Sequence, residues 1–199
     1  MHTVPSPERL AEVLQQVWAS LAEGAASRQS PFHQGVFASV SEHGPETRYL
    51  VLRRAVAELG VLTFHTDSRS PKCSQLDRDP RASWCFFAEG VQLRCSGRAA
   101  VQREGDAVDS AWERTGGFSR RSYLVESEPG AELDGPGSGL SEDILARPPS
   151  LEAGEPGRAH FAVVELSVER IDWLHLAHSG HRRAGFERSN GWRGRWLQP

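Results

Sequence analysis

The sequence predicts a mainly β fold with peripheral helices. Short segments alternate apolar and polar side chains and are separated by clusters of turn residues, a pattern typical of antiparallel strands. The 199 residues include 19 Gly and 12 Pro, which favours many turns over a helical bundle. Strands and single helices are mixed rather than alternated as β-α-β units. A chain of this length suits one well-buried core, so we expect a single domain over 1–199.

The first expected element is an amphipathic helix that begins at Ser6-Pro7-Glu8. Ser6 can cap free amide groups, and Pro7 has the backbone angle of a first helical turn. Apolar residues then recur at helical spacing until the pattern fades at Gly24. These residues are Leu10, Leu14, Val17, Trp18 and Leu21.

Three strands are expected next. From Gly35 the period changes to two, and Gly44-Pro45 supplies a turn. A strand over 49–56 follows, and after Glu58-Leu59-Gly60 the segment 61–66 is the next strand. Because their connection is short, we expect these last two strands to form a hairpin.

A short helix is predicted to start at Ser70-Pro71-Lys72 and to end at Asp79-Pro80, because proline disfavours a helical residue before it. Further strands are expected at 82–88 and 91–101, then a helix at 106–114. The composition between 126 and 157 shifts to Gly, Pro, Ser and Glu, which predicts a long surface loop over 126–159. The C-terminal strands are expected at 161–166, 170–176 and 192–197.

Charge and cysteine usage narrow the functional classes. A net charge of -3 gives no long-range field that would attract nucleic acid or an acidic membrane, so neither partner is expected. Cys73, Cys85 and Cys95 lack metal-binding spacing and resemble reduced cytosolic thiols, so no metal site is predicted. The sequence shows neither a signal peptide nor a membrane span, which favours a cytoplasmic protein.

The most informative stretch runs from Phe64 to Lys72, where a strand end leads into a helix start. Free amides at a helix N-terminus, together with Arg69 and Lys72, favour binding of a dianionic phosphate. The alternative is a capped surface helix with two solvated cations. Arg48 joins the same site if the predicted hairpin brings it near, and is otherwise an arginine that shields a sheet edge.

Three segments together resemble the pyridoxamine 5′-phosphate oxidase family: Arg48-Tyr49-Leu50-Val51-Leu52-Arg53, the run 64–72, and Asp79-Pro80-Arg81-Ala82. The T-D-x-R-S-x-K form of the second segment resembles an FMN-binding branch of that family. The resemblance implies an FMN-binding split β-barrel that forms a homodimer, with the flavin at the subunit interface.

The resemblance also implies roles for individual residues. Arg48 and Lys72 would contact the FMN phosphate, with Arg69 and Ser70 assisting. The side-chain amide of Gln92 would reach the flavin. The backbone of two segments would lie along the isoalloxazine ring, and their residues are Arg48, Tyr49, Leu50, Val51, Arg53, His65 and Thr66. Without the resemblance, Gln92 would be interpreted as a solvated strand residue.

Residues near the C-terminus resemble contributions from the second subunit. They are Trp173, Arg182 and Arg183. The alternative for Trp173 is a buried core aromatic, because tryptophan is highly buried on average. The alternative for the two arginines is a basic turn beside Gly180.

Several positions depart from the vitamin B6 oxidases. Arg53 stands where those enzymes have a lysine, and their C-terminal Arg-x-His signature is not reproduced. The substrate-phosphate residues are not matched, although 119–122 offers serines and arginines. We therefore expect an FMN-dependent oxidoreductase, in which the flavin accepts a hydride from a small-molecule substrate. The sequence does not identify that substrate. The alternative is a non-catalytic protein that binds FMN or haem.

Overall fold

The computed structural model describes residues 8–199, so Ser6 and Pro7 of the expected helix start lie outside the described residues. Helix α1 spans Leu10–Ala26 and continues past Gly24. A Cβ atom at Gly24 would lie 2.4 Å from the carbonyl oxygen of Phe32. The glycine therefore allows a close approach of the following loop to the helix, and the helix ends two residues after the apolar pattern fades.

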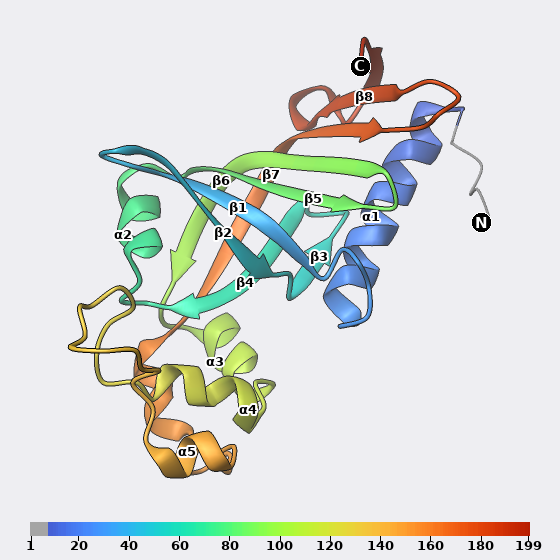
Figure 1. The fold of residues 1–199 in the computed structure, drawn as a ribbon. Helices are drawn as coiled ribbons and strands as arrows, with labels where there is room; N and C mark the ends of the chain where they lie inside the picture. Colours follow the sequence, from blue (N-terminus) through green and yellow to red (C-terminus); the bar gives the residue numbers. More distant parts are fainter. Residues whose placement is uncertain (1–7) are drawn as a thin grey trace.

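The strands form one antiparallel sheet with the order β2-β1-β5-β6-β7-β4-β3, and β8 and β9 extend it from β7 (Figure 1). This arrangement confirms the mainly β fold with peripheral helices. The strands span β1 Gln34–Ser41, β2 Gly44–Val51, β3 Arg54–Val56, β4 Val61–Asp67, β5 Arg81–Ala88, β6 Val91–Gln102, β7 Phe161–His175, β8 Arg182–Glu187 and β9 Gly194–Leu197.

The sheet closes into a barrel where β2 passes into β3. One strand was expected over 49–56, but the ladder breaks at Leu52 and Arg53. The Leu52 amide donates to the His33 carbonyl at 2.9 Å, and the Arg53 amide donates to the Thr63 carbonyl at 2.8 Å. The first acceptor lies just before β1 and the second lies in β4. The chain therefore leaves the β1 side of the sheet and joins the β4 side at this point.

The expected β3–β4 hairpin is confirmed, with Arg54 opposite Thr63. Gly44-Pro45 was expected to form the preceding turn, but both residues begin β2 because Gly44 already pairs with Ser41. The turn lies at residues 42–43 instead.

Strand β7 replaces the two strands that were expected over 161–166 and 170–176. The strand stays paired with β6 through a register shift at Ser96/Gly97, so no break separates the two expected segments. A Cβ atom at Gly97 would lie 1.9 Å from the Ser167 carbonyl oxygen, so only glycine fits this bulge. Strand β8, where a basic turn was the alternative, pairs with the C-terminal part of β7.

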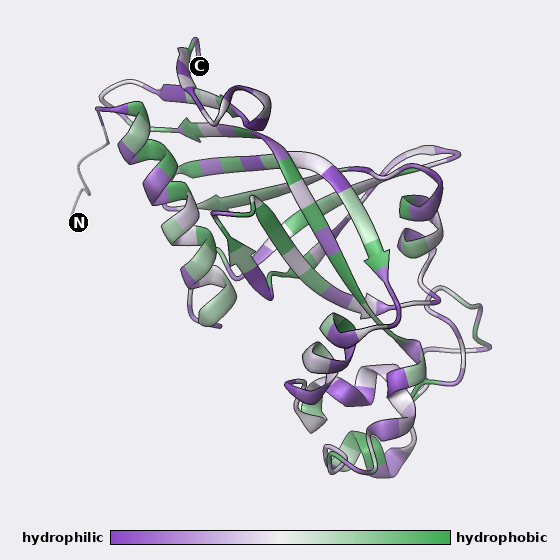
Figure 2. Cartoon of the chain, turned by 180° about the vertical axis from the view of Figure 1, so that it is seen from behind, coloured by the Kyte–Doolittle hydropathy of each residue, from purple (hydrophilic) through white to green (hydrophobic). Residues whose placement is uncertain are grey.

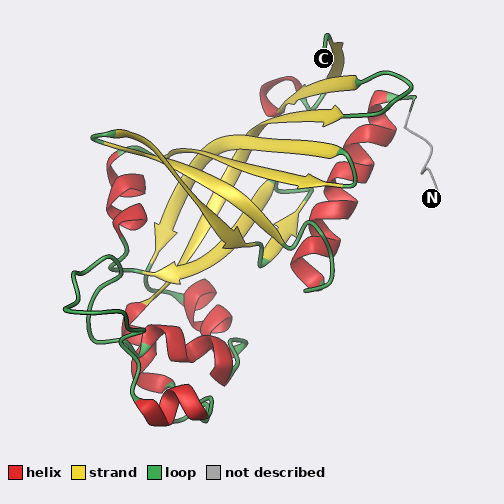
Figure 3. Ribbon diagram, in the orientation of Figure 1, coloured by secondary structure: helices red, strands yellow, loops and turns green. Residues whose placement is uncertain are grey.

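The helices cover the two ends of the barrel. Helix α2, Pro71–Arg78, has Ser70 as its N-cap residue and Asp79 as its C-cap residue, as the sequence predicts. Helices α3, α4 and α5 gather at the end of the molecule opposite the β8 hairpin (Figure 3). The bounds of these helices are α3 Asp106–Glu113, α4 Gly117–Arg120 and α5 Glu142–Ala146. Short 3₁₀ helices are η1 Arg121–Tyr123, η2 Glu155–His160 and η3 Arg188–Asn190.

Two apolar clusters stabilise the fold. The main core fills the barrel and includes an edge-to-face group of Phe37, Phe64 and Trp84. A second cluster packs α3 and η1 on β7 through Trp112 and Phe161, among other side chains. Figure 2 shows the corresponding alternation of hydrophilic and hydrophobic residues along the strands. No helix within residues 8–199 is long and apolar enough to cross a membrane.

Candidate functional site

The junction of β4 and α2 holds an ammonium group that has no carboxylate partner among residues 8–199. Lys72 is the only lysine in the sequence. Its Nζ atom donates to Thr66 Oγ1 at 3.0 Å and to Ser70 Oγ, and it forms no salt bridge with any residue that the structure describes. Burial lowers the pKa of Lys72. The side chain therefore presents a partly desolvated positive charge at a helix N-terminus.

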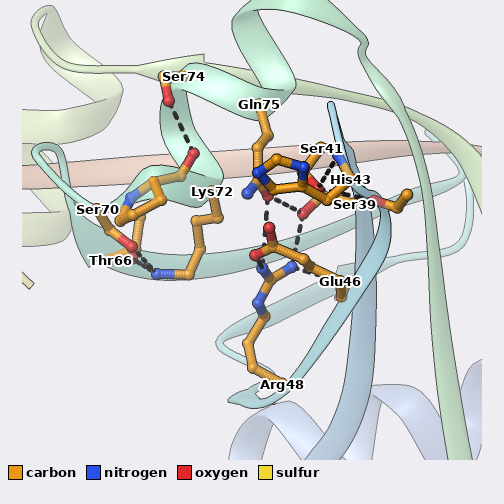
Figure 4. Close-up of polar contacts among 12 residues, drawn as sticks. Ser39, Ser41, His43, Glu46, Arg48, Thr66, Ser70, Lys72, Ser74 and Gln75 are labelled. Carbon is orange, nitrogen blue, oxygen red and sulfur yellow. Dashed lines mark hydrogen bonds and ion pairs between the residues drawn. The ribbon is translucent and has the colours of Figure 1, made fainter. Parts of the chain in front are cut away.

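Arg48 lies on the inner face of β2 and points toward α2 (Figure 4). Its Nη1 atom donates to Ser39 Oγ at 2.6 Å, and its Nη2 atom pairs with Glu46 Oε2 at 3.2 Å. Burial lowers the pKa of Arg48. The charge of Arg48 also contributes to the lowered pKa of Lys72, so the structure brings these two predicted phosphate contacts into one electrostatic environment.

Gln75 joins the two sides of this site and was not predicted from the sequence. Its Oε1 atom accepts from Ser39 Oγ at 2.6 Å and, through a longer contact of 3.4 Å, from Arg48 Nη2. Gln75 lies three residues after Lys72, which places both residues on one side of α2. This helical spacing was the signal in the sequence that identifies Gln75 as part of the site.

Arg69 is held differently from Lys72. Its Nη2 atom pairs with Asp67 Oδ2 at 2.8 Å, and its guanidinium also donates to the carbonyl oxygens of Val125 at 2.9 Å and Glu126 at 2.7 Å. The hydrogen bonds that Arg69 donates to the Asp67 carboxylate raise the pKa of Arg69. In this structure Arg69 fastens the segment after η1 to the end of β4, while Ser70 remains beside Lys72.

The residues predicted to border the flavin ring differ in orientation. Tyr49 is 73% exposed on the outer face of β2, whereas Leu50 packs against the core and Val51 ends the strand. On β4, the His65 ring packs edge-to-face on Phe161 at 4.9 Å between centroids.

The environment of His65 favours its neutral form. Burial, followed by the charges of Arg53 and Arg114, lowers the pKa of His65 to about 4. Burial also lowers the pKa of Arg53 and raises that of Tyr123, two groups that interact electrostatically with each other. The chain therefore places positive charge around a neutral imidazole on the side of β4 away from the main core.

The predicted C-terminal contacts lie on two faces of the sheet. Trp173 pairs with Leu93 and is buried in the main core, in agreement with the alternative of a core aromatic. Gln92 instead pairs with Leu174, which pairs with Arg183, so these three residues share the outer face. The Arg183 guanidinium forms an ion pair with Asp172 at 2.8 Å.

A cavity of about 390 Å³ lies beside β8 and β9. It is lined by Glu8, His181, Arg182, Arg183, Trp196, Leu197 and Pro199. In Figure 1 this hairpin and α2 lie at different ends of the sheet, so one chain does not bring Arg182 and Arg183 to Lys72. The described residues contain no group of three or more His, Cys, Asp or Glu side chains that could hold a metal ion.

Residues 15–103 match the family model described as pyridoxamine 5′-phosphate oxidase, FMN-binding domain. This segment contains Arg48, Lys72, Gln75 and Gln92. The chain has the split-barrel fold of pyridoxamine 5′-phosphate oxidase-like proteins, and its residues 15–103 resemble that family's FMN-binding domain. The resemblance inferred from the sequence is thereby confirmed, and the expected split-barrel fold is confirmed by two crystal structures.

Two crystal structures share the split-barrel fold over nearly the whole chain. A pyridoxamine 5′-phosphate oxidase-related, FMN-binding protein from Nostoc punctiforme is 21% identical, with 99% of this chain and 100% of that chain covered and a TM-score of 0.70. PhzG from Burkholderia lata, in complex with tetrahydrophenazine-1-carboxylic acid, is 19% identical, with 97% and 94% covered and a TM-score of 0.69. No curated protein sequence matches the chain significantly.

Within this split barrel, Arg120 has a structural position. Arg120 belongs to the segment 119–122, whose serines and arginines are available for substrate-phosphate contacts in the sequence. Arg120 is buried, however, and donates to the carbonyl oxygens of Trp112, Thr115 and Leu151 at 2.8 to 3.0 Å. Its guanidinium thus holds α3, α4 and the following segment together.

Proposed function

We propose that the chain binds FMN and that Lys72, Arg48 and Ser70 hold its phosphate. The observation that carries this proposal is the ammonium group of the only lysine, which lies between two hydroxyl groups and has no salt-bridge partner among the described residues. A desolvated cation is stabilised by an anion, and a dianionic phosphate at a helix N-terminus supplies one. The match of residues 15–103 to an FMN-binding domain supports the choice of FMN among phosphorylated ligands.

Arg69 enters the proposal in a supporting role. The family resemblance assigns it to the phosphate, but its Nη atoms are engaged by Asp67 and by two backbone carbonyl groups. We propose that Arg69 stabilises the backbone around the phosphate and that Lys72 and Arg48 provide the principal charges.

The flavin site is proposed to be completed by a second copy of the chain. Tyr49 and Phe87, which are 73% and 64% exposed, lie on the outer face of the sheet together with Gln92 and Arg183. In Figure 3 strands β1, β2, β5 and β6 are seen with no helix in front of them. A homodimer formed through this face would bury both aromatic side chains.

The proposed activity is an FMN-dependent oxidation or reduction of a small molecule. FMN, when bound, supplies a flavin that accepts a hydride. The chain fixes the phosphate with Lys72 and Arg48, while His65 remains a neutral hydrogen-bonding group because its pKa is about 4. Arg53 and Arg114 add positive charge near His65, which favours an anionic substrate.

Titration with FMN and with riboflavin tests the binding proposal, since riboflavin lacks the phosphate. We expect the purified protein to prefer FMN, and Lys72→Met to remove much of that preference, by on the order of 1.5–3 kcal/mol. Equal affinity of the unaltered protein for the two flavins would contradict the phosphate site.

The activity is tested by turnover of the FMN-loaded protein. Pyridoxamine phosphate, pyridoxine phosphate and reduced nicotinamides are added in turn without oxygen, and bleaching of the flavin absorbance is followed. Bleaching by one donor supports the oxidoreductase. Binding of FMN without bleaching by any donor in the screen would favour the non-catalytic FMN-binding alternative, and binding of haemin in place of FMN would favour the haem-binding one.

A further inference from the structure

Gln75 is a buried amide at the centre of the polar contacts around Arg48. Gln75 is only 3% exposed, and Ser39, which donates a hydrogen bond to it, is 1% exposed. Ser39 Oγ in turn accepts from Arg48 Nη1, so a continuous chain of hydrogen bonds runs from Arg48 through Ser39 to α2 (Figure 4). Buried polar groups of this kind are costly unless each one has a partner, so the three side chains fix one another.

The chemistry of an amide suits this position. The Oε1 atom of Gln75 accepts from Ser39 and Arg48, and hydrogen bonding by Gln75 is the largest cause of the lowered pKa of Glu46. A single neutral side chain therefore accepts from two donors and still offers an amide donor near Glu46. A glutamate would accept in the same way, but it would place a second negative charge beside Glu46 and close to a bound phosphate.

We infer that Gln75 is a positioning residue of the phosphate site and that it acts through Arg48. This inference rests on the proposed function, because it assumes that Arg48 contacts the FMN phosphate. Gln75 joins α2, which carries Lys72, to strands β1 and β2, which carry Ser39 and Arg48. It thereby sets the distance between the two cations that receive one phosphate group.

The test compares FMN and riboflavin affinity in variants of the full chain. Gln75→Met keeps the approximate volume of the side chain and removes its polar contacts. We expect the ratio of FMN to riboflavin affinity to fall about tenfold, as for the loss of one hydrogen bond to a charged group. Gln75→Glu retains both acceptor contacts, but its negative charge repels the phosphate. We therefore expect this variant to lower the ratio of FMN to riboflavin affinity more than Gln75→Met does. Ser74→Ala, on the exposed side of the same helix, is the matched control and should keep the ratio of the unaltered protein.

A double-mutant cycle shows whether Gln75 acts through Arg48. In an Arg48→Met background, Gln75→Met should leave the affinity ratio unchanged. A merely structural role would lower the thermal stability of the protein and weaken both flavins equally. If Gln75→Met does not fold, Gln75→Glu and the Arg48→Met background carry the same comparison.

The outcomes separate the inference from the function on which it rests. If the unaltered protein does not prefer FMN over riboflavin, the proposed phosphate site fails. If it does prefer FMN and both Gln75 variants keep that preference, the phosphate site stands and the positioning role of Gln75 is overturned. If Gln75→Met lowers the affinity ratio equally with Arg48 and with Arg48→Met, the inference that Gln75 acts through Arg48 is overturned.

Discussion

Glu46 places a negative charge inside a site that we propose for an anion. Its carboxylate pairs with Arg48 Nη2 at 3.2 Å, and hydrogen bonds involving Gln75 and Ser41 are the leading causes of its lowered pKa. The Glu46 side chain is 45% exposed, so water can hydrate its carboxylate when that group turns away from Arg48. The carboxylate thus occupies part of the Arg48 guanidinium that a phosphate would use.

Glu46→Gln is therefore expected to strengthen FMN binding. The change removes a competing negative charge while it retains a hydrogen-bonding side chain of the same shape. We expect FMN affinity to rise roughly two- to fivefold at low salt, with riboflavin affinity unchanged. Isothermal titration of both flavins checks this expectation, and weaker FMN binding would mean that Glu46 supports the site instead of competing with it.

His65 should make the stability of the fold sensitive to acid. Its pKa is 6.5 in an ordinary environment and about 4 in the folded protein, mainly because of burial. The unfolded chain therefore binds a proton more readily, and the free energy of unfolding falls as the pH decreases from 6.5 toward 4. We expect a loss on the order of 2 kcal/mol from this residue over that window.

Urea unfolding at several pH values measures this effect. His65→Phe keeps an aromatic ring against Phe161 but cannot titrate, so its stability should depend less on pH between 6.5 and 4. His43→Gln removes an exposed histidine from the turn between β1 and β2 and serves as the control. Identical pH profiles for His65→Phe and the unaltered protein would refute the assignment.

At the level of elements, α2 and the strand before it could be predicted because their signals are local. Ser70 and Pro71 start the helix and Asp79-Pro80 ends it, and Lys72 follows from its place in that helix. The partners of Arg48 depend on contacts between distant segments. Ser39 and Gln75 are separated by 36 positions, and only the β1–β2 register together with the packing of α2 brings them together.

Arg69 illustrates the same limit. Its proximity to Lys72 in the sequence suggested a shared phosphate, but the Glu126 carbonyl that it binds lies 57 positions away. The outer-face position of Leu174, and the core position of Trp173, likewise follow from the β6–β7 register. A shift of one residue in the β6–β7 register would exchange the two faces of the strand. The apolar pattern of β7 alone does not determine that register.

Arg69→Ala should loosen the segment that follows η1. The substitution removes the hydrogen bonds to the Val125 and Glu126 carbonyl oxygens, so the segment 125–153 loses its attachment to β4. We expect faster limited proteolysis within that segment and a smaller loss of FMN affinity than for Lys72→Met. Arg81→Ala, which affects an exposed ion pair with Asp79, is the control. If Arg69→Ala weakens FMN as much as Lys72→Met without changing proteolysis, Arg69 contacts the phosphate directly.

At the scale of the whole molecule, the outer face of the sheet should determine the oligomeric state. Phe87→Glu places a charge on the face that we propose for dimerisation, because Phe87 is exposed on β5. We expect the proposed dimer to dissociate, as measured by size-exclusion chromatography with light scattering, and FMN affinity to fall with it. Phe118→Glu changes an equally prominent aromatic residue on α4 and should leave the oligomeric state unaltered. A monomeric unaltered protein that binds FMN would contradict the shared site.

The central claim, that the FMN phosphate is held by Lys72, is tested most directly by acylation of that amine. Because Lys72 is the only lysine, peptide mass spectrometry reports modification of its side chain without ambiguity. The lowered pKa of Lys72 should favour its reaction with an amine-specific reagent. We predict that saturating FMN protects Lys72 from acylation and that saturating riboflavin does not. Equal rates of acylation with and without bound FMN would contradict the account.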